Sequence, residues 1–74
     1  MKKSKDEVLE ILSTRNISKC DFSIGIIDNE PLYLWVIIDT ITWKELSNEW
    51  LRENIIDIQP WDENNIRISI DNVY

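Results

Sequence analysis

The side chain of this sequence best suited to act as a nucleophile is the thiol of Cys20. A catalytic thiol needs a neighbouring base or cation that favours the thiolate, and the sequence contains no histidine that could form a Cys–His pair. The adjacent Lys19 could lower the pKa of this thiol only slightly. The sequence also lacks a Gly-rich phosphate loop and a Ser-His-Asp set, so acid–base chemistry would fall to carboxylates alone. We therefore expect no enzymatic activity, and a structural or merely tolerated thiol.

The Asp- and Asn-rich runs are the next candidates, because their oxygen atoms could bind a cation. They lie at Asp28-Asn29-Glu30, Asp62-Glu63-Asn64-Asn65 and Asp71-Asn72. A calcium loop of the EF-hand kind has ligands at alternating positions, a central Gly and a closing Glu, and none of these runs has that pattern. A structural zinc site is excluded because the chain has one cysteine and no histidine. We expect no metal, no other cofactor, and ordinary solvated turns at these runs.

The charge of the chain restricts the class of partner. There are 14 acidic and 8 basic residues, which gives a formal charge of −6. The acidic excess lies in residues 21–74, whereas residues 1–20 are net basic. Nucleic acids and anionic membranes are bound by clustered Lys and Arg, so direct binding to either is disfavoured. A protein with a basic surface would instead be attracted to residues 21–74.

Length and segment composition indicate one compact domain over residues 1–74, with a flexible end at residues 1–3. A core of this size rarely supplies more than ~3–5 kcal/mol. No run approaches the roughly 18 apolar residues of a membrane span. The basic start, Met1–Lys5, is not followed by the apolar segment of a signal peptide. One free cysteine and no export signal favour a cytoplasmic location.

The chain that must position these side chains is organised around the apolar run Leu32–Ile38. Seven apolar residues follow Pro31 without interruption. Because successive strand residues point to opposite faces, both faces of this strand are apolar. Residues 21–27 alternate in polarity, and residues 28–31 have turn chemistry. Together these segments predict an antiparallel hairpin.

Two capping boxes predict the helices. They are Ser4-Lys5-Asp6-Glu7 and Thr42-Trp43-Lys44-Glu45, in which the first side chain bonds the backbone three residues on and the Glu returns the bond. We expect helices over residues 4–15 and 42–53. Asn16 is the expected left-handed residue after the first helix.

The last two strands are predicted at residues 54–59 and 66–70, where Ile recurs at every second position. A two-residue turn at Asn64-Asn65 would give one register. A wider loop, which would pair Ile58 with Ile66, is preferred because it places Ile opposite Ile. The predicted fold is therefore α+β, with the order α-β-β-α-β-β and a four-stranded, mainly antiparallel sheet on which both helices pack.

The second face of the strand at residues 32–38 is the main functional candidate. If the even-numbered residues face the helices, then Tyr33, Trp35 and Ile37 point away and lack an assigned cover. Tyr and Trp are the usual anchors of protein interfaces. An alternative of equal weight is that a helix or a loop covers this face and that Trp35 belongs to the core.

The loop after residue 60 adds further candidates. A Trp in a polar loop, such as Trp61, can contact a partner, although it more often folds back as a lid on the core. The acids of this loop could imitate phosphate groups and occupy a basic groove, or simply be solvated. The predicted partner-binding residues are Tyr33, Trp35, Ile37, Trp61, Asp62 and Glu63.

These features favour a small acidic protein-binding module, namely an inhibitor or antagonist that docks on a basic, nucleic-acid-handling protein. Immunity proteins and phage-encoded inhibitors of host defence share this general size and charge. The Ile- and Asn-rich, Ala-free composition is typical of an AT-rich gene, which fits a phage or mobile element. The alternative is a structural or adaptor module that self-associates as a homodimer, through the bare sheet face or the edge of the strand at residues 66–70.

Overall fold

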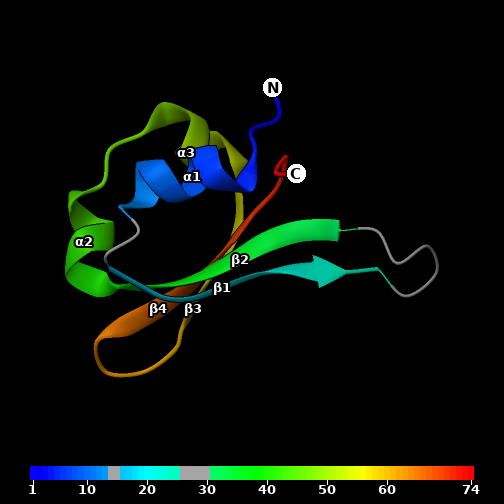
Figure 1. Ribbon diagram of the computed structural model, residues 1–74. Coiled ribbons are helices and arrows are strands. Elements are labelled where there is room, and N and C mark those ends of the chain that lie inside the picture. Colours follow the sequence, from blue (N-terminus) through cyan, green and yellow to red (C-terminus); the bar gives the residue numbers. More distant parts are fainter. Residues whose placement is uncertain (14–15, 26–30) are drawn as a thin grey trace.

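The computed structural model describes residues 1–13, 16–25 and 31–74, and it places four strands in one sheet with three helices on one side of it (Figure 1). The elements in chain order are α1 (Lys5–Leu12), β1 (Ile17–Ile24), β2 (Pro31–Asp39), α2 (Thr40–Glu45), α3 (Glu49–Asn54), β3 (Ile55–Pro60) and β4 (Asn65–Ile70). This arrangement confirms the α+β class. The predicted order α-β-β-α-β-β also holds, except that the second helical region is split in two.

The strand order of the sheet is β1-β2-β4-β3, and every neighbouring pair is antiparallel. The apolar run therefore lies in an internal strand, paired on both sides. The strand at residues 66–70 is internal as well, so the prediction that it forms an edge is wrong. An internal place suits β4 because Ile68, Ser69 and Ile70 are buried, which means that this strand is covered on both of its faces. The two edges of the described sheet are β1 and β3.

The first capping box forms as predicted. The N–H of Glu7 donates to Ser4 Oγ at 3.2 Å, and the N–H of Ser4 donates to Glu7 Oε1 at 3.4 Å. The helix is shorter than expected, because Ser13 takes the left-handed conformation, with φ of 60°. Asn16 is thus not the left-handed end of α1. The reason is topological, since β1 begins at Ile17 and the chain must turn back toward the sheet before that residue.

The single helix predicted over residues 42–53 is wrong. The Asp39 carboxylate accepts the N–H of Thr42 at 2.8 Å, so the N-cap of α2 lies three residues earlier than the capping box indicated. A second cap interrupts the helix, because the Asn48 side chain accepts the N–H of Leu51 at 2.9 Å. Asp and Asn are the strongest N-cap residues. Each of them starts a new short helix where the amphipathic pattern alone indicated a continuous one.

The core lies between the sheet and the helices. Its fully buried side chains alternate along β2 and β4 and are completed by aliphatic residues of α1 and α3: Val8, Leu12, Leu34, Val36, Ile38, Leu51, Ile68 and Ile70. The even-numbered residues of β2 therefore face the helices, except that Leu32, near the start of the strand, is exposed. This placement confirms the assumption, made in the sequence analysis, that the even-numbered residues of β2 face the helices and the odd-numbered residues point away from them.

The register of the β3–β4 hairpin differs from both predicted registers. Ile58 lies opposite Ile68 rather than Ile66, and Pro60 lies opposite Ile66. Ile58 still lies opposite an isoleucine, as the apolar argument predicted. The predicted register is nevertheless wrong, because the observed one is displaced by two residues. The shift arises in the loop, where Asp62 Oδ1 accepts the N–H groups of the second and third residues after it, at 2.8 and 2.9 Å, and so fixes a loop of four residues.

The two ends of the chain run side by side (Figure 1). The N–H of Lys3 donates to the carbonyl oxygen of Asn72 at 3.0 Å, and the N–H of Tyr74 donates to the carbonyl oxygen of Lys3 at 3.0 Å. The indole Nε1 of Trp50 donates to the carbonyl oxygen of Met1 at 2.7 Å. The flexibility expected for residues 1–3 stays a prediction, and these hydrogen bonds oppose it.

Candidate functional site

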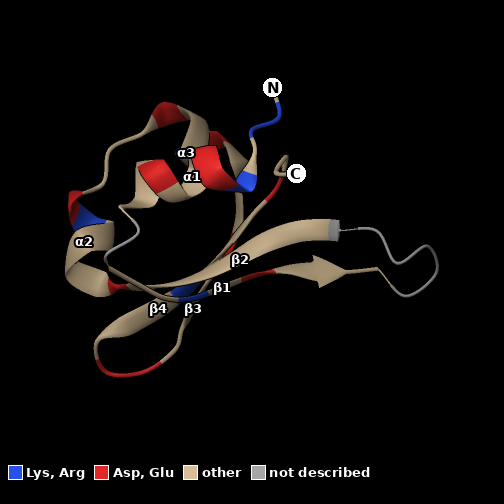
Figure 2. Cartoon of the chain, in the orientation of Figure 1, with Lys and Arg blue, Asp and Glu red and all other residues tan. Residues whose placement is uncertain are grey.

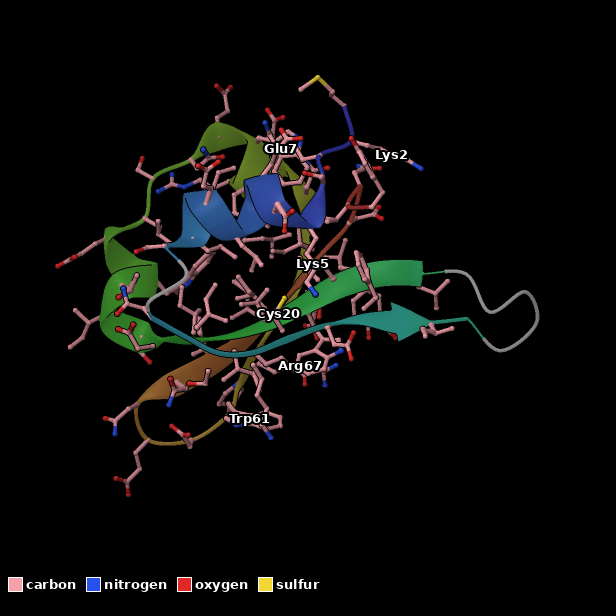
Figure 3. All side chains as sticks on the ribbon, in the orientation of Figure 1. Lys2, Lys5, Glu7, Cys20, Trp61 and Arg67 are labelled. Carbon is pink, nitrogen blue, oxygen red and sulfur yellow. The ribbon has the colours of Figure 1, made fainter. Side chains whose placement is uncertain are left out.

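The candidate site is the surface of the sheet that faces away from the three helices, which we call the outer face. Strand alternation and the observed registers place ten residues on it. They are Lys19, Asp21 and Ser23 from β1, Tyr33, Trp35 and Ile37 from β2, Asp57 and Gln59 from β3, and Arg67 and Ser69 from β4. Arg67 lies on this side of the sheet, opposite Cys20 and α1 (Figure 3).

The three predicted residues of β2 share the outer face but differ in exposure. Tyr33 and Trp35 are partly exposed, whereas Ile37 is only 1% exposed. The register puts Ile37 between Lys19 on one neighbouring strand and Arg67 on the other. The long aliphatic stems of such residues cover apolar surface while their charged ends reach water. Ile37 is therefore placed to support the face, and its two aromatic neighbours are placed to make contacts.

Arg67 and Trp35 form the centre of the outer face. The guanidinium carbon of Arg67 lies 5.1 Å from the centroid of the Trp35 ring. The two residues are diagonal neighbours, since Arg67 faces Ile37 and Trp35 faces Ser69 across the same strand pair. A cation over an indole contributes about 0.5–1 kcal/mol at an exposed site and about 2 kcal/mol when desolvated. This contact restrains the Arg67 side chain on the outer face.

The Arg67 guanidinium has hydrogen-bonding capacity that the described residues do not use. Its Nε atom is buried and has no hydrogen-bond partner among them. Within the same part of the chain, the one ion pair joins Lys3 Nζ and Glu7 Oε2 at 3.9 Å, on the helix side. A buried N–H without a partner costs about 1–3 kcal/mol, which is at least as much as the stack contributes. The contact between Arg67 and Trp35 is thus not explained by a net gain in stability.

Trp61 also lies on the outer side of the sheet, as Figure 3 shows, and it is 50% exposed. It directly follows β3, where its N–H donates to the carbonyl oxygen of Asn65 at 3.2 Å. Trp61 is not part of the apolar cluster formed by the described core residues. The interpretation of this residue as a lid on that core is therefore wrong, because the observed register turns the side chain away from the helices.

Asp62 and Glu63 are exposed in the loop beside Trp61. Hydrogen bonds from the backbone N–H of Asn64 and from the Asn65 side chain hold the pKa of the Asp62 carboxyl below its ordinary value. The Asp62 carboxylate thus stays charged and fixed in position. Glu63 makes no hydrogen bond with the described residues, so its carboxylate is free to reach a partner.

Charge is distributed unevenly over the two sides of the molecule. Acidic residues gather on the outside of α1 and α3 and in the loop between β3 and β4, while basic residues occur near the N-terminus, in α2 and in the middle of the sheet (Figure 2). On the outer face, Lys19 and Arg67 are accompanied by Asp21 and Asp57. The outer face itself is therefore mixed in charge, and the loop at its border supplies the acidic character.

Cys20 belongs to the opposite side of the sheet. It pairs with Val36, and its side chain points toward the helices, whereas Lys19 lies on the outer face (Figure 3). Burial raises the pKa of the Cys20 thiol, although the charge of Lys5 acts in the other direction. The expected effect of Lys19 on the thiol is therefore wrong. A thiol with a raised pKa is a poor nucleophile at neutral pH.

The remaining features of the chain give weaker evidence for a functional site. A hollow of about 290 Å³, lined by Ser47, Glu49, Arg52 and Glu53, lies on the helix side and is formed by exposed side chains. Within residues 1–13, 16–25 and 31–74, no group of three or more His, Cys, Asp or Glu side chains is placed to hold a metal ion. No helix in those ranges is long and apolar enough to cross a membrane. The acidic run at residues 28–30 lies outside the described residues.

Comparison with known proteins adds no further constraint. No family model, curated protein or solved structure matches the chain. The functional interpretation therefore depends on the outer face itself.

Arg67 is the site residue that sequence reasoning does not identify. Its signal in the sequence is weak, because alternation over residues 66–70 places Arg67 on the polar face of a half-exposed strand without showing what lies beside it. The pairing of β4 with β2 brings Arg67 next to Trp35. That pairing joins segments far apart in the chain, and neither turn chemistry nor hydrophobic periodicity specifies it.

Proposed function

We propose that this chain is a protein-binding module that docks through its outer face on a basic, nucleic-acid-handling protein and inhibits it. The observation that carries the proposal is the contact at the centre of the outer face, where the Arg67 guanidinium lies over the partly exposed Trp35 ring, 5.1 Å from its centroid. Trp61 extends the same surface and is half exposed.

The residue types support a binding role. Trp, Tyr and Arg are the side chains most often found to dominate interface energies, because they contribute large, rigid contact areas. Here Tyr33, Trp35 and Arg67 lie on strands of a sheet, and Trp61 lies in the short loop directly after β3. The stack with Trp35 already fixes the Arg67 side chain, so less conformational entropy would be lost when a partner binds.

The charges support a basic partner. Asp62 and Glu63 border the outer face, and the chain as a whole has a net charge of −6. Acidic side chains attract a cationic surface over a distance and raise the association rate. Proteins that handle nucleic acid carry such surfaces. Occupation of that surface by an acidic module would exclude the phosphate backbone, which is the proposed mechanism of inhibition.

The experiment is affinity capture from the host lysate with the wild-type chain and with Trp61→Ala, followed by a competition assay on the purified partner. Trp61 is half exposed, so its removal should leave the fold intact. The matched control is Tyr74→Ala, which removes an exposed aromatic side chain at the C-terminus. We expect the wild-type chain and the control to displace nucleic acid from the partner, and Trp61→Ala to do so about tenfold less potently.

The dependence of binding on salt concentration separates the contribution of the acidic side chains from that of the aromatic side chains. Glu63→Gln should reduce the association rate at low salt and have little effect at high salt, because exposed charges are screened there. The proposal is wrong if the captured protein has no basic surface, or if Trp61→Ala competes as well as the wild-type chain. A partner that is bound without loss of its nucleic-acid binding would support docking and overturn inhibition.

A further inference from the structure

The free side of β3 is the most exposed apolar edge in the described sheet. β3 pairs with β4 on one side, and no strand among the described residues pairs with its other side. Ile56 and Ile58 are 55% and 49% exposed along this edge. An edge strand presents a row of unpaired N–H and C=O groups, which is a template for pairing with another chain.

The direction of the main-chain groups of β3 follows from its two ends. The N–H of Trp61 donates to Asn65 at 3.2 Å, and the N–H of Asp71 donates to Asn54 at 2.8 Å, so the odd-numbered residues of β4 face β3. Hydrogen-bonded pairs recur at every second residue of an antiparallel ladder. The N–H and C=O of Ile58 therefore point to the free side. Pro60 fits this pattern, because a proline within a sheet lies where its missing N–H would face away from the ladder.

We infer that β3 binds β3 of a second copy of this chain, antiparallel, about a twofold axis that passes between the two Ile58 residues. In this register Ile58 and its counterpart exchange both N–H···O=C bonds. Asp57 faces Gln59 of the second copy, so a carboxylate meets an amide donor. Ile56 faces Pro60 of the second copy at each end of this ladder, where the bulge and the missing N–H of Pro60 end the regular pairing.

Self-complementarity selects this register and this occupant. A shift of two residues in one direction places Asp57 opposite Asp57 of the second copy, and like charges directly opposite are destabilising. A shift in the other direction pairs Ile58 with Pro60, which cannot donate. The register centred on Ile58 avoids the charge repulsion, and it keeps one residue pair that exchanges both bonds, with Pro60 at the ends of the ladder. It also closes on itself, because the twofold axis uses the β3 edge of each copy once.

The pairing is short, and the dimer should therefore be weak. A bulge between Ile55 and Asp57 ends the regular part of β3 on one side, and Pro60 ends it on the other. Such a small interface falls at the low end of specific interfaces. The axis is perpendicular to the sheet, so the helix layers of both copies lie on one side and the two outer faces lie on the other.

Sedimentation equilibrium tests the inference on the full chain. We expect the mean mass to rise with concentration from 8.9 kDa toward twice that value. Ile58→Lys places two cations at the axis and should abolish the dimer. The matched control is Ile41→Lys, which changes a side chain that is 73% exposed on α2 and should leave the dimer intact. Circular dichroism verifies that both variants keep their secondary structure.

A pair of charge variants at one position tests the register. Gln59→Lys places a cation opposite Asp57 of the second copy and should tighten the dimer a few-fold, whereas Gln59→Glu places two acids together and should weaken it by a similar factor. The dimer dissociation constant is the quantity to compare, because Gln59 also faces Arg67 within its own chain.

A wild-type mass that stays at the monomer value at every concentration would overturn the inference, as would a dimer that survives Ile58→Lys. Equal dissociation constants for the two Gln59 variants would overturn the register. A dimer that depends on β1 instead would count against it as well. Trp61→Ala, which tests the outer face, should leave the dimer unchanged, so failure of one proposal is distinguishable from failure of the other.

Discussion

The two faces of β2 are both apolar, but they are covered by different means. On the helix side, Leu34, Val36 and Ile38 are fully buried against α1 and α3. On the outer side, Ile37 is buried too, yet no helix in the described part of the chain lies over it (Figure 1). The register places Lys19 and Arg67 on its two flanks, so the cover consists of side chains that belong to the sheet itself.

This difference concerns how firmly each face is covered. A packed layer of helices cannot leave the sheet without unfolding the chain, whereas exposed side chains change rotamer in nanoseconds. The helix layer is therefore the more rigid cover. On the outer side the contact with Trp35 restrains Arg67, whereas Lys19 is exposed and freer to move.

The largest effect is expected on the helix side. Leu34→Ala removes a fully buried side chain of the core and should lower the free energy of unfolding by about 2–5 kcal/mol. That loss is comparable to the whole stability of a domain of this size, ~3–5 kcal/mol. The matched control is Leu32→Ala, since Leu32 lies two residues earlier in the same strand and is 58% exposed.

Urea unfolding measures both variants. We expect Leu32→Ala to change the free energy of unfolding by no more than about 0.5 kcal/mol. Similar losses for the two variants would mean that the helices cover β2 along its whole length, and the contrast between its covered and exposed parts would be wrong.

Substitution of two neighbouring isoleucines allows a direct comparison of the helix layer with the side-chain cover of the outer face. Ile38 faces the helices and Ile37 faces outward, and both are buried. Ile38→Ala should cost about 2–5 kcal/mol, as is typical when a rigid core keeps the cavity. Ile37→Ala should cost roughly 1–2 kcal/mol, at or below the lower end of that range, because long side chains on either side can collapse into the space.

The comparison requires the two variants to be measured in the same denaturant series, with equal m-values as the check on two-state unfolding. Equal losses would show that the outer cover is as rigid as the helix layer. In that case the contrast between the two covers of β2 would be wrong.

Much of the fold follows from local rules in the sequence. The capping box at Ser4, the alternation along β2 and the antiparallel first hairpin each depend on residues that are near one another in the chain, and the structure contains all three. The errors occurred where two local rules competed. Asp39 and Asn48 capped short helices where periodicity favoured one long helix, and Asp62 fixed a loop that moved the last hairpin by two residues.

Only part of the candidate site could be predicted from local rules in the sequence. Strand alternation identified Tyr33, Trp35 and Ile37 as members of one face, and the structure places them there. It could not identify Arg67, because the guanidinium reaches Trp35 only through the pairing of β2 with β4. The hairpin register that Asp62 fixes also decided that Trp61 turns away from the core. Whether these residues bind a partner stays a prediction.

The smallest effect concerns the two carboxylates that organise the ends of strands, one on each side of the sheet. Hydrogen bonds from Thr42 hold the pKa of Asp39 below its ordinary value, and those from Asn64 and Asn65 do the same for Asp62. A carboxyl whose pKa is lower in the folded state binds fewer protons there than in the unfolded chain, so stability rises with pH in this range. The contribution is complete above the unfolded value of about 3.9 and is lost as the pH falls through the lower, folded value.

Thermal unfolding between about pH 5 and pH 2 tests this expectation. Asp39→Asn and Asp62→Asn keep an oxygen acceptor but remove the charge, so each should flatten the fall of the melting temperature on the acid side. Glu63→Gln is the control from the same loop, because its carboxylate makes no hydrogen bond with the described residues. If Asp62→Asn flattens the curve and Asp39→Asn does not, the carboxylate of the outer loop is the more tightly held of the two. The opposite result would assign the rigid carboxylate to the helix side and leave the acidic border of the outer face mobile.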